Sequence, residues 1–187
     1  MNKAEISGEL IRLDFSHETH GKRFFAGEIK TLRMSGCADI IPIVVPEEHI
    51  NRKKHVRVTG RIRTRITKNG RRKVYVYLFV DHMEECKEVY ENSVELSGRI
   101  AKPTVYRITP FGIDITEVLL EIERTYGKKD YIPCICWGED AKNAEELWTG
   151  TEICVKGRFQ SRDYTKDGKI ETTHEVSVKK IEVIENG

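Results

Sequence analysis

The sequence predicts an all-β protein of two tandem five-stranded barrels, each with a short helix or loop between its third and fourth strands. Three observations predict this fold. The 187 residues align as two halves of a repeat, each half contains five stretches typical of strands, and the second half carries a helical pattern after its third strand. The sequence therefore predicts two domains, residues 1–88 and 92–187.

The repeat rests on four pairs of matching segments. NKAEISGEL at residue 2 matches NSVELSGRI at 92, and ADIIPIVV at 38 matches KDYIPCIC at 129. Further along, VRVTGRI at 56 matches ICVKGRF at 153, and TKNG at 67 matches TKDG at 165. A repeat of about ninety residues has the size of one small domain.

Apolar and polar residues alternate in five stretches of each half, which is typical of β-strands. The expected strands are 3–13, 22–33, 39–45, 55–66 and 72–83, followed by 93–103, 113–124, 130–137, 152–163 and 170–184. Residues 139–148 place Ala141, Ala144 and Leu147 or Trp148 at helical spacing. Five strands with a helix between the third and fourth form the order of an OB-fold barrel.

Glycines fall inside several of these strand patterns, where a missing side chain usually marks a bulge or a close approach of two backbones. They are Gly8, Gly60, Gly98 and Gly157. We interpret them as structural residues.

The net charge of +2 hides an asymmetry between the halves. Residues 1–91 hold 18 Lys and Arg against 13 Asp and Glu, whereas residues 92–187 hold 14 against 17. The window 52–73 contains 11 basic residues and no acidic one. Such a window predicts either attraction of an anionic polymer or a solvated charged surface, and we favour the polymer because eleven uncompensated charges serve no structural purpose.

This basic window leads into a predicted hairpin whose faces differ. A three-residue loop at 68–70 would set Ile62 opposite Val76. The other face then collects arginine and aromatic side chains: Arg57, Arg61, Arg63, Arg65, Tyr75, Tyr77 and Phe79. This mixture is typical of nucleic-acid surfaces and also of subunit interfaces. In the second half the same loop would set Val155 opposite Lys179, which predicts a bulge or a four-residue loop there.

The second half carries a longer signature. Its segments, in order, are NSVELSGRI, YRITPFGIDI, DYIPCICWGEDAKNAEEL, GTEICVKGRFQSRDYTKDG and THEVSV. Through them residues 92–185 resemble the bacterial single-stranded DNA-binding protein family, whereas the first half is related mainly through the repeat. The resemblance implies a non-enzymatic protein that coats single-stranded DNA with little sequence preference during replication, recombination or repair.

The resemblance also implies which residues bind. Bases would stack on aromatic residues at both ends of the third strand and before the last hairpin turn, which are Tyr131, Trp137 and Tyr164. Basic residues would follow the phosphates: Arg99, Arg107, Arg124, Lys128, Lys129, Lys156, Arg158 and Arg162. The corresponding first-half positions hold the non-aromatic Ile40, Val45 and Ile66. The first half is therefore expected either to bind through its basic hairpin, including Tyr75 and Tyr77, or to serve assembly.

Partners follow from the same resemblance. Family members combine four barrels, so two barrels per chain imply a homodimer. Many members recruit other proteins through a flexible acidic tail, and a sequence ending in KKIEVIENG predicts that this route is absent. The alternative function is an OB-fold adaptor of a primosome or of a plasmid or phage replication complex, in which nucleic-acid contact is secondary.

Other function classes lack support in the sequence. There is no apolar run near 18 residues and no signal peptide, so we expect a cytoplasmic, nucleoid-associated bacterial protein without membrane contact. Five cysteines without CxxC spacing indicate a reducing compartment, and Cys134 and Cys136 are interpreted as buried thiols rather than zinc ligands. Trp148 is expected to pack against the barrel. No nucleotide-binding or catalytic motif occurs, which predicts no enzyme activity, cofactor or metal.

Overall fold

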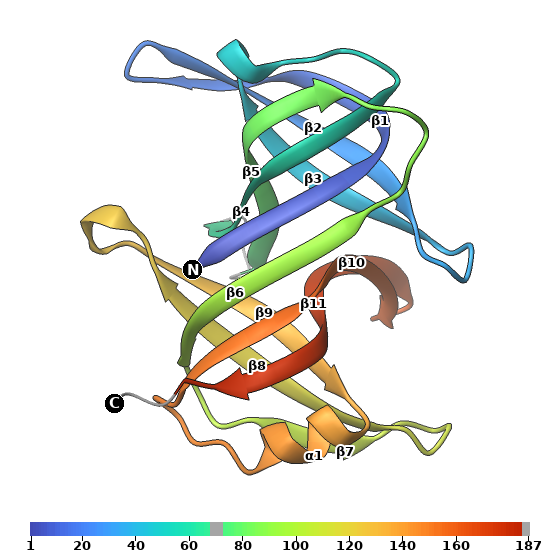
Figure 1. The fold of residues 1–187 in the computed structure, drawn as a ribbon, viewed down its shortest axis with the longest axis vertical. Coiled ribbons are helices and arrows are strands. Elements are labelled where there is room, and N and C mark those ends of the chain that lie inside the picture. The colour runs from blue at the N-terminus through green and yellow to red at the C-terminus, as the bar shows by residue number, and fades with distance from the viewer. Residues whose placement is uncertain (68–72, 185–187) are drawn as a thin grey trace.

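The structure is a computed structural model that describes residues 1–67 and 73–184 (Figure 1). Its first half contains five strands, and a short 3-10 helix, Glu47–His49, follows the third. The strands are β1 (Asn2–Thr19), β2 (Lys22–Leu32), β3 (Ala38–Pro46), β4 (His55–Thr67) and β5 (Lys73–Glu85). Strand β1 pairs with both β2 and β4, β3 lies between β2 and β5, and β4 pairs with β5.

The second half repeats this order and closes a five-stranded barrel. Its elements are β6 (Asn92–Ile100), β7 (Val105–Ile108), β8 (Asp114–Glu123), β9 (Lys129–Trp137), α1 (Glu139–Glu145), β10 (Glu152–Lys166) and β11 (Lys169–Val183). Strand β6 pairs with both β8 and β10, β9 lies between β8 and β11, and β10 pairs with β11. A 3-10 turn at Thr125–Gly127 precedes β9.

The predicted strands and the helix are confirmed, with one addition. Strand β7 was not predicted, because its four residues pair only with the adjacent β8 and are too short to show a clear alternation. In α1, Ala141 and Ala144 are fully buried as predicted, and Leu147 packs on the core. The prediction that Trp148 packs against the barrel is wrong. It is 79% exposed because the helix ends at Glu145, before it could turn that ring onto the barrel.

The strand glycines do mark close backbone contacts. A Cβ atom at Gly60 would lie 2.0 Å from the carbonyl oxygen of Phe79, and one at Gly157 would lie 2.1 Å from that of Ser177. Both distances are far below the van der Waals contact distance. The strands can therefore approach this closely only because glycine occupies these two positions. The two glycines occupy the same place in the two halves and fix which residues correspond.

The first long hairpin keeps its predicted faces but changes its register. Ile62 pairs with Leu78 rather than with Val76, and the predicted loop at 68–70 lies outside the described residues. A shift of two residues leaves each side chain on its predicted face, because side chains alternate with a period of two. In the second half the predicted bulge is confirmed: Lys156 pairs with Lys180 and Gly157 with Val178. The turn there needs two residues, both with positive φ, at Asp167 and Gly168.

The halves join edge to edge through β1 and β6, which cross the middle of the molecule side by side (Figure 1). Asn2 pairs with Leu96, and Ile6 pairs with Asn92. Because Asn2 matches Asn92 in the repeat and Ile6 matches Leu96, the pairing is the same when the halves are exchanged. The junction is therefore pseudo-twofold symmetric.

A buried carboxylate strengthens each side of this junction. Asp130 accepts hydrogen bonds from the backbone N–H of Thr64 and from its own ion-pair partner, Arg124. Its counterpart Asp39 accepts from the backbone N–H of Ser161 at 2.9 Å. Both carboxylates have side chains 1% exposed and paired to arginine. We call these two buried carboxylates, with their bonds across the junction, the clasps. They fix the position of one half relative to the other.

Candidate nucleic-acid interface

The outer face of β9 presents the two aromatic residues at its ends. Side chains alternate along this strand, so that Ile132, Cys134 and Cys136 point into the barrel and are buried. Tyr131 and Trp137 point outward and are 37% and 36% exposed. They lie six positions apart on the strand, which corresponds to about 20 Å. The two rings thus mark the ends of one surface.

Polar contacts fix the edges of the three predicted stacking rings. The indole N–H of Trp137 donates to the hydroxyl of Ser177 at 3.1 Å, and the hydroxyl of Tyr164 donates to Glu171 at 2.9 Å. Hydrogen bonding to Glu121 raises the pKa of Tyr131, as bonding to Glu171 raises the pKa of Tyr164. A ring held by its edge loses less conformational entropy when a base stacks on its face.

Between these rings lies a polar network on β10 and β11. Glu175, 6% exposed, accepts two hydrogen bonds from Arg162, at 2.9 and 3.2 Å, and one from Gln160 at 3.0 Å. The Arg162 guanidinium lines a groove of about 210 Å³ together with Val105 and Pro133. Bonding to Glu175 raises the pKa of Arg162. Two carboxylates, Glu117 and Glu175, line the same groove, and Glu175 neutralises Arg162. The groove therefore offers apolar surface for bases rather than an unpaired cation for phosphate.

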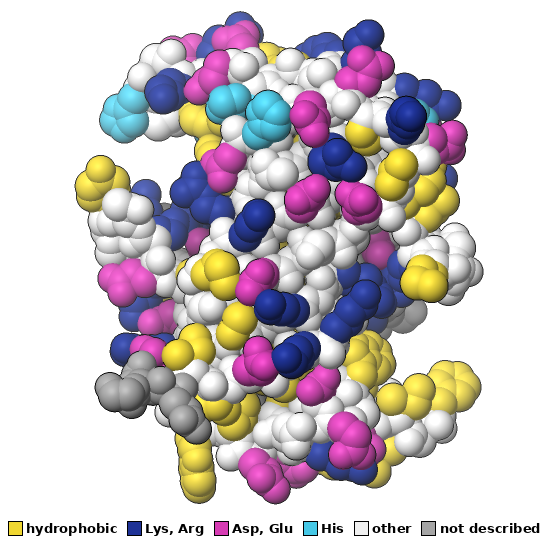
Figure 2. Space-filling model, viewed as in Figure 1, with side chains coloured by type: hydrophobic (Ala, Val, Ile, Leu, Met, Phe, Trp, Pro, Cys, Tyr) yellow, Lys and Arg dark blue, Asp and Glu magenta, His cyan; other side chains and the backbone are white. Residues whose placement is uncertain are grey.

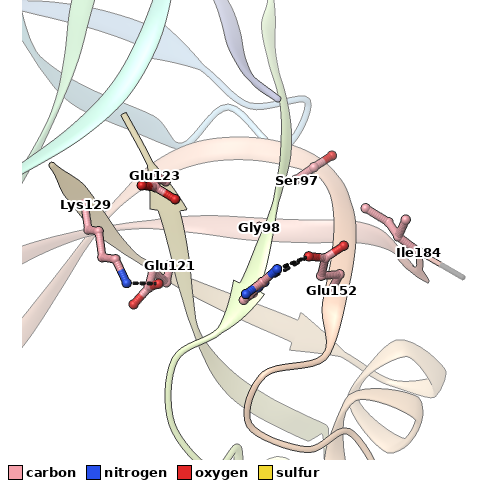
Figure 3. Close-up of a pocket in the computed structure, with 8 residues that line it drawn as sticks. Ser97, Gly98, Glu121, Glu123, Lys129, Glu152 and Ile184 are labelled. Atoms are coloured by element: carbon pink, nitrogen blue, oxygen red, sulfur yellow. Dashed lines mark hydrogen bonds and ion pairs between the residues drawn. The ribbon is translucent and has the colours of Figure 1, made fainter. Parts of the chain in front are cut away.

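Most of the predicted phosphate-binding side chains already have carboxylate partners. Arg99 pairs with Glu152 and Lys129 with Glu121, and all four residues line one hollow. Figure 3 shows this hollow with Lys129, Glu121 and Glu152 labelled. The remaining paired residues are Arg57 with Glu5, Glu84 and Glu91, Arg61 with Asp81, Arg107 with Glu117, Arg124 with Asp130, Lys156 with Glu95, and Arg162 with Glu175. On the face shown in Figure 2, basic and acidic side chains are correspondingly interspersed.

The expectation of uncompensated charge in the window 52–73 therefore holds only in part among the described residues, because Lys53, Lys54, Arg57, Arg61 and Lys73 have acidic partners. Strand pairing brings acids from β1, β5 and β11 beside its cations, as in the pairs Arg61 with Asp81 and Lys73 with Glu171. Within residues 1–67 and 73–184, four predicted binding cations have no carboxylate ion pair: Arg63, Arg65, Lys128 and Arg158. These four are the strongest candidates for phosphate contacts, because a phosphate has no bound acid to displace there.

The arginine and aromatic face of the first hairpin forms as predicted. Arg63 pairs across the strands with Tyr77, and Arg65 with Tyr75. The Arg63 guanidinium lies 4.0 Å from the ring centre of Phe79, and that of Arg65 lies 4.8 Å from the ring of Tyr75. Burial raises the pKa of Tyr75. The rings of Phe79 and Tyr75 are therefore already partly covered by guanidinium groups.

Two first-half assignments need correction. Val45 is fully buried in the core, and the position that corresponds to Trp137 is Pro46, which is buried as well. The glycine match also places Tyr164 opposite Thr67 in the repeat rather than opposite Ile66. Each error is a shift of one residue, which exchanges the inner and outer faces of a strand. The conclusion that this half lacks the three aromatic residues is unchanged.

Several aromatic residues at the surface were not predicted as candidates for binding. Phe24 on β2 stacks on His17, with ring centres 4.9 Å apart, and lies 6.2 Å from Phe79. Phe111 and Tyr126, in turns, are 90% and 98% exposed. The strand alternation could have placed Phe24 outward, but no sequence signal shows where a turn residue points.

The remaining candidates give no competing site. Burial raises the pKa of the Cys136 thiol to about 12 and that of Cys134 further, as expected of buried thiols. No group of three or more potential metal ligands occurs in the described ranges. Among those same residues, no helix is long and apolar enough to cross a membrane.

Comparison with known proteins gives one family. Residues 91–184 match the Single-strand binding protein family. A Listeria monocytogenes relative called single-stranded DNA-binding protein 2 is 33% identical over 102 residues, 50% of this chain and 64% of that protein. A Bacillus cereus single-stranded DNA-binding protein is 32% identical over 102 residues, 50% of this chain and 60% of that one. The chain thus spans less than two thirds of these relatives.

The fold extends the likeness to both halves. A crystal structure of the wild-type single-stranded DNA binding protein from Thermus aquaticus superposes with a TM-score of 0.82 at 18% identity. The alignment covers 100% of this chain and 94% of that one. At this identity the likeness describes the architecture alone.

Proposed function

Because the chain belongs to the single-strand binding protein family, we propose that it binds and coats single-stranded DNA with little sequence preference. The observation that carries the proposal is the outer face of β9, where Tyr131 and Trp137 stand about 20 Å apart and expose rings fixed at their edges. Every base offers a ring face, so stacking provides affinity without reading sequence. Replication, recombination and repair are the processes that expose such strands.

We further propose that residues 1–88 and 92–187 are tandem OB-fold domains and that the chain forms a homodimer with four barrels. The repeated pairing order, the matched glycines and the superposition across both halves support the tandem arrangement. The second domain supplies the stacking rings. The first contributes charge and aromatic surface through Arg63, Arg65, Tyr75 and Tyr77.

The test uses tryptophan fluorescence, because the chain has one tryptophan on the proposed surface and one elsewhere. Trp148→Phe leaves Trp137 as the reporter, and Trp137→Phe leaves Trp148. We expect oligo-dT to quench the first variant and to leave the signal of the second nearly unchanged. Duplex DNA of equal length should bind more weakly, and RNA is the third ligand to compare. Equal affinity for duplex and single strand would remove the coating proposal.

The adaptor function keeps one supporting observation, which is the large share of basic side chains with acidic partners. Cations that are already paired with carboxylates leave less free positive charge to attract a nucleic acid. Normal folding without quenching of Trp137 by any oligonucleotide would favour the adaptor.

A further inference from the structure

A hollow of about 440 Å³ opens at the junction of the two halves. The first half contributes residues of β4, and the second half contributes the end of β8 and the turn before β9. Two carboxylates, those of Glu123 and Asp130, and four basic side chains line it: Arg61, Arg63, Arg124 and Lys128. The hollow exists only because the halves are clasped together, since Asp130 binds Thr64 of the other half beside it.

Two of these four cations are already neutralised. Arg61 makes two hydrogen bonds to Asp81, at 2.5 and 3.0 Å, and Arg124 pairs with the buried Asp130. Arg63 and Lys128 have no carboxylate ion pair within the described ranges. Burial lowers the pKa of Arg63, and repulsion from Arg124 and then Arg61 lowers it further. Glu123 also lines the hollow and has no ion pair within the described ranges. Two unpaired cations against one unpaired carboxylate leave an excess of positive charge that a bound anion would relieve.

An aromatic side chain stands at the edge of the same hollow. Tyr126 is 98% exposed and adopts a positive φ of 71°, a backbone conformation that is uncommon for a non-glycine residue. It lies two residues before Lys128 in the 124–128 turn. A cation pair beside an exposed ring is the combination that a nucleotide requires, because the phosphate binds the cations and the base stacks.

The pseudo-twofold axis produces a second hollow of about 390 Å³, lined by Arg33, Arg158, Lys179 and Tyr90. Arg33 is neutralised by Asp39, as Arg124 is by Asp130. Arg158 has a neutral partner, Gln160, and its buried Nε has none among the described residues. The same excess of charge thus recurs at the equivalent place, although the residues that supply it differ.

We infer that the hollow between the halves is a phosphate-binding site that carries a single strand from one half to the other, with Arg63 and Lys128 on the phosphate and Tyr126 on a base. The inference rests on the proposed function. It assigns the junction, in addition to the two outer faces, a part in binding. It also gives the first half a role that does not depend on the missing aromatic residues.

The experiment compares short and long oligo-dT. About 8 nucleotides fit within one OB fold, whereas about 35 exceed it and can span both halves. We expect the double variant Arg63→Gln/Lys128→Gln to lower the affinity for the long oligonucleotide about tenfold. The salt slope of this binding should fall by about 1.4, which is about 0.7 for each lost phosphate contact. Affinity for the short one should change less than about twofold. Lys180→Gln, which removes a charge paired with Glu182 on another surface, is the control.

Each outcome has a separate meaning. If the wild-type protein binds neither oligonucleotide, the proposed function fails. Suppose instead that the wild type binds both oligonucleotides. If the double variant then binds both as tightly as the wild type, or loses affinity for both equally, only the crossing site is overturned. Displacement of the long oligonucleotide by micromolar inorganic tripolyphosphate at constant ionic strength would identify a free-polyphosphate site and overturn the inference as well.

A second measurement avoids the risk that the double variant misfolds. Tyr126 has no packing role at 98% exposure, so Tyr126→Ala should fold normally. We expect this variant to lower the affinity for the long oligonucleotide about tenfold, because the loss of one stacking contact has an effect of that order. Photo-crosslinking of the wild type to iodouracil-substituted long oligonucleotide should label Tyr126. Normal affinity of Tyr126→Ala, or no crosslink at this residue, would contradict the inference.

Discussion

The backbone N–H of Thr64 in the first half donates a hydrogen bond to Oδ1 of Asp130 in the second half, with a nitrogen-to-oxygen distance of 2.6 Å. The Asp130 side chain is 1% exposed, so this contact and its ion pair to Arg124 replace the water that the carboxylate loses. Asp39 has the same function on the other side of the junction. The relative placement of the two halves thus depends on two buried charges.

The first prediction concerns these charges. Asp130→Ala should lower the free energy of unfolding by about 3–5 kcal/mol, because it leaves the Arg124 guanidinium half-buried without its partner. Asp39→Ala should lower the free energy of unfolding by a similar amount. Asp81→Ala, which breaks the exposed pair with Arg61, should cost at most about 1 kcal/mol. Urea denaturation measures the free energy of unfolding of all three variants. Equal losses of stability at the buried and exposed sites would contradict the stabilising role of the two buried carboxylates.

The second prediction separates stacking from charge. Tyr164→Ala should weaken oligo-dT binding by about 1–3 kcal/mol and leave the salt slope nearly unchanged. Tyr164→Phe is the matched control, since it keeps the ring and removes only the hydroxyl that donates to Glu171. Fluorescence titrations at several salt concentrations give both quantities. If Tyr164→Phe weakens binding as much as Tyr164→Ala, the residue acts through its hydroxyl rather than its ring.

The third prediction concerns the first hairpin. Reversal of Arg61, Arg63 and Arg65 to glutamate should weaken binding and flatten the salt slope by about 0.7 for each lost phosphate contact. Arg61 should contribute least, because Asp81 already neutralises it. Single reversals measured by the same titration test that order. Unchanged affinity together with a switch from dimer to monomer would instead identify the hairpin as a subunit interface.

The fourth prediction concerns pH. His174 lies against the first half, with Nε2 2.9 Å from the carbonyl oxygen of Ile40. Burial lowers the pKa of His174, and the nearby carboxylates and Ile40 oppose this shift in part. The unfolded chain binds the proton more tightly, with a pKa near the usual value of about 6.5.

Stability from this group is therefore present above about pH 6.5 and is lost as the pH falls toward the lowered folded pKa. The free energy of unfolding should drop between pH 7 and 5, and His174→Gln should show a smaller drop. Urea titrations of both proteins across this range measure the difference. An identical pH dependence in the two proteins would rule out His174 as the cause.

The fifth prediction concerns assembly. Light scattering should give a mass near twice the 21.6 kDa of one chain, since two such chains supply four barrels. A single monomeric species at micromolar concentration would contradict the proposed homodimer.

Local patterns in the sequence were sufficient for much of this fold. Alternation along 130–137 predicts β9 and the outward direction of Tyr131 and Trp137, because a strand's faces depend on residues two positions apart. The spacing of Ala141 and Ala144 predicts the helix, because residues three positions apart lie on one face of a helix. The repeat predicts that the halves share one strand order, which the pairings follow.

The partners of the charged residues came from the tertiary structure alone. Arg61 and Asp81 are 20 residues apart in the chain, and Lys73 and Glu171 are 98 apart. Whether such residues meet depends on strand register and on the packing of the halves, and a shift of one residue moves a side chain to the other face. The same contacts decide that Arg63 and Lys128 line one hollow, because a junction between distant segments has no local pattern that could encode it.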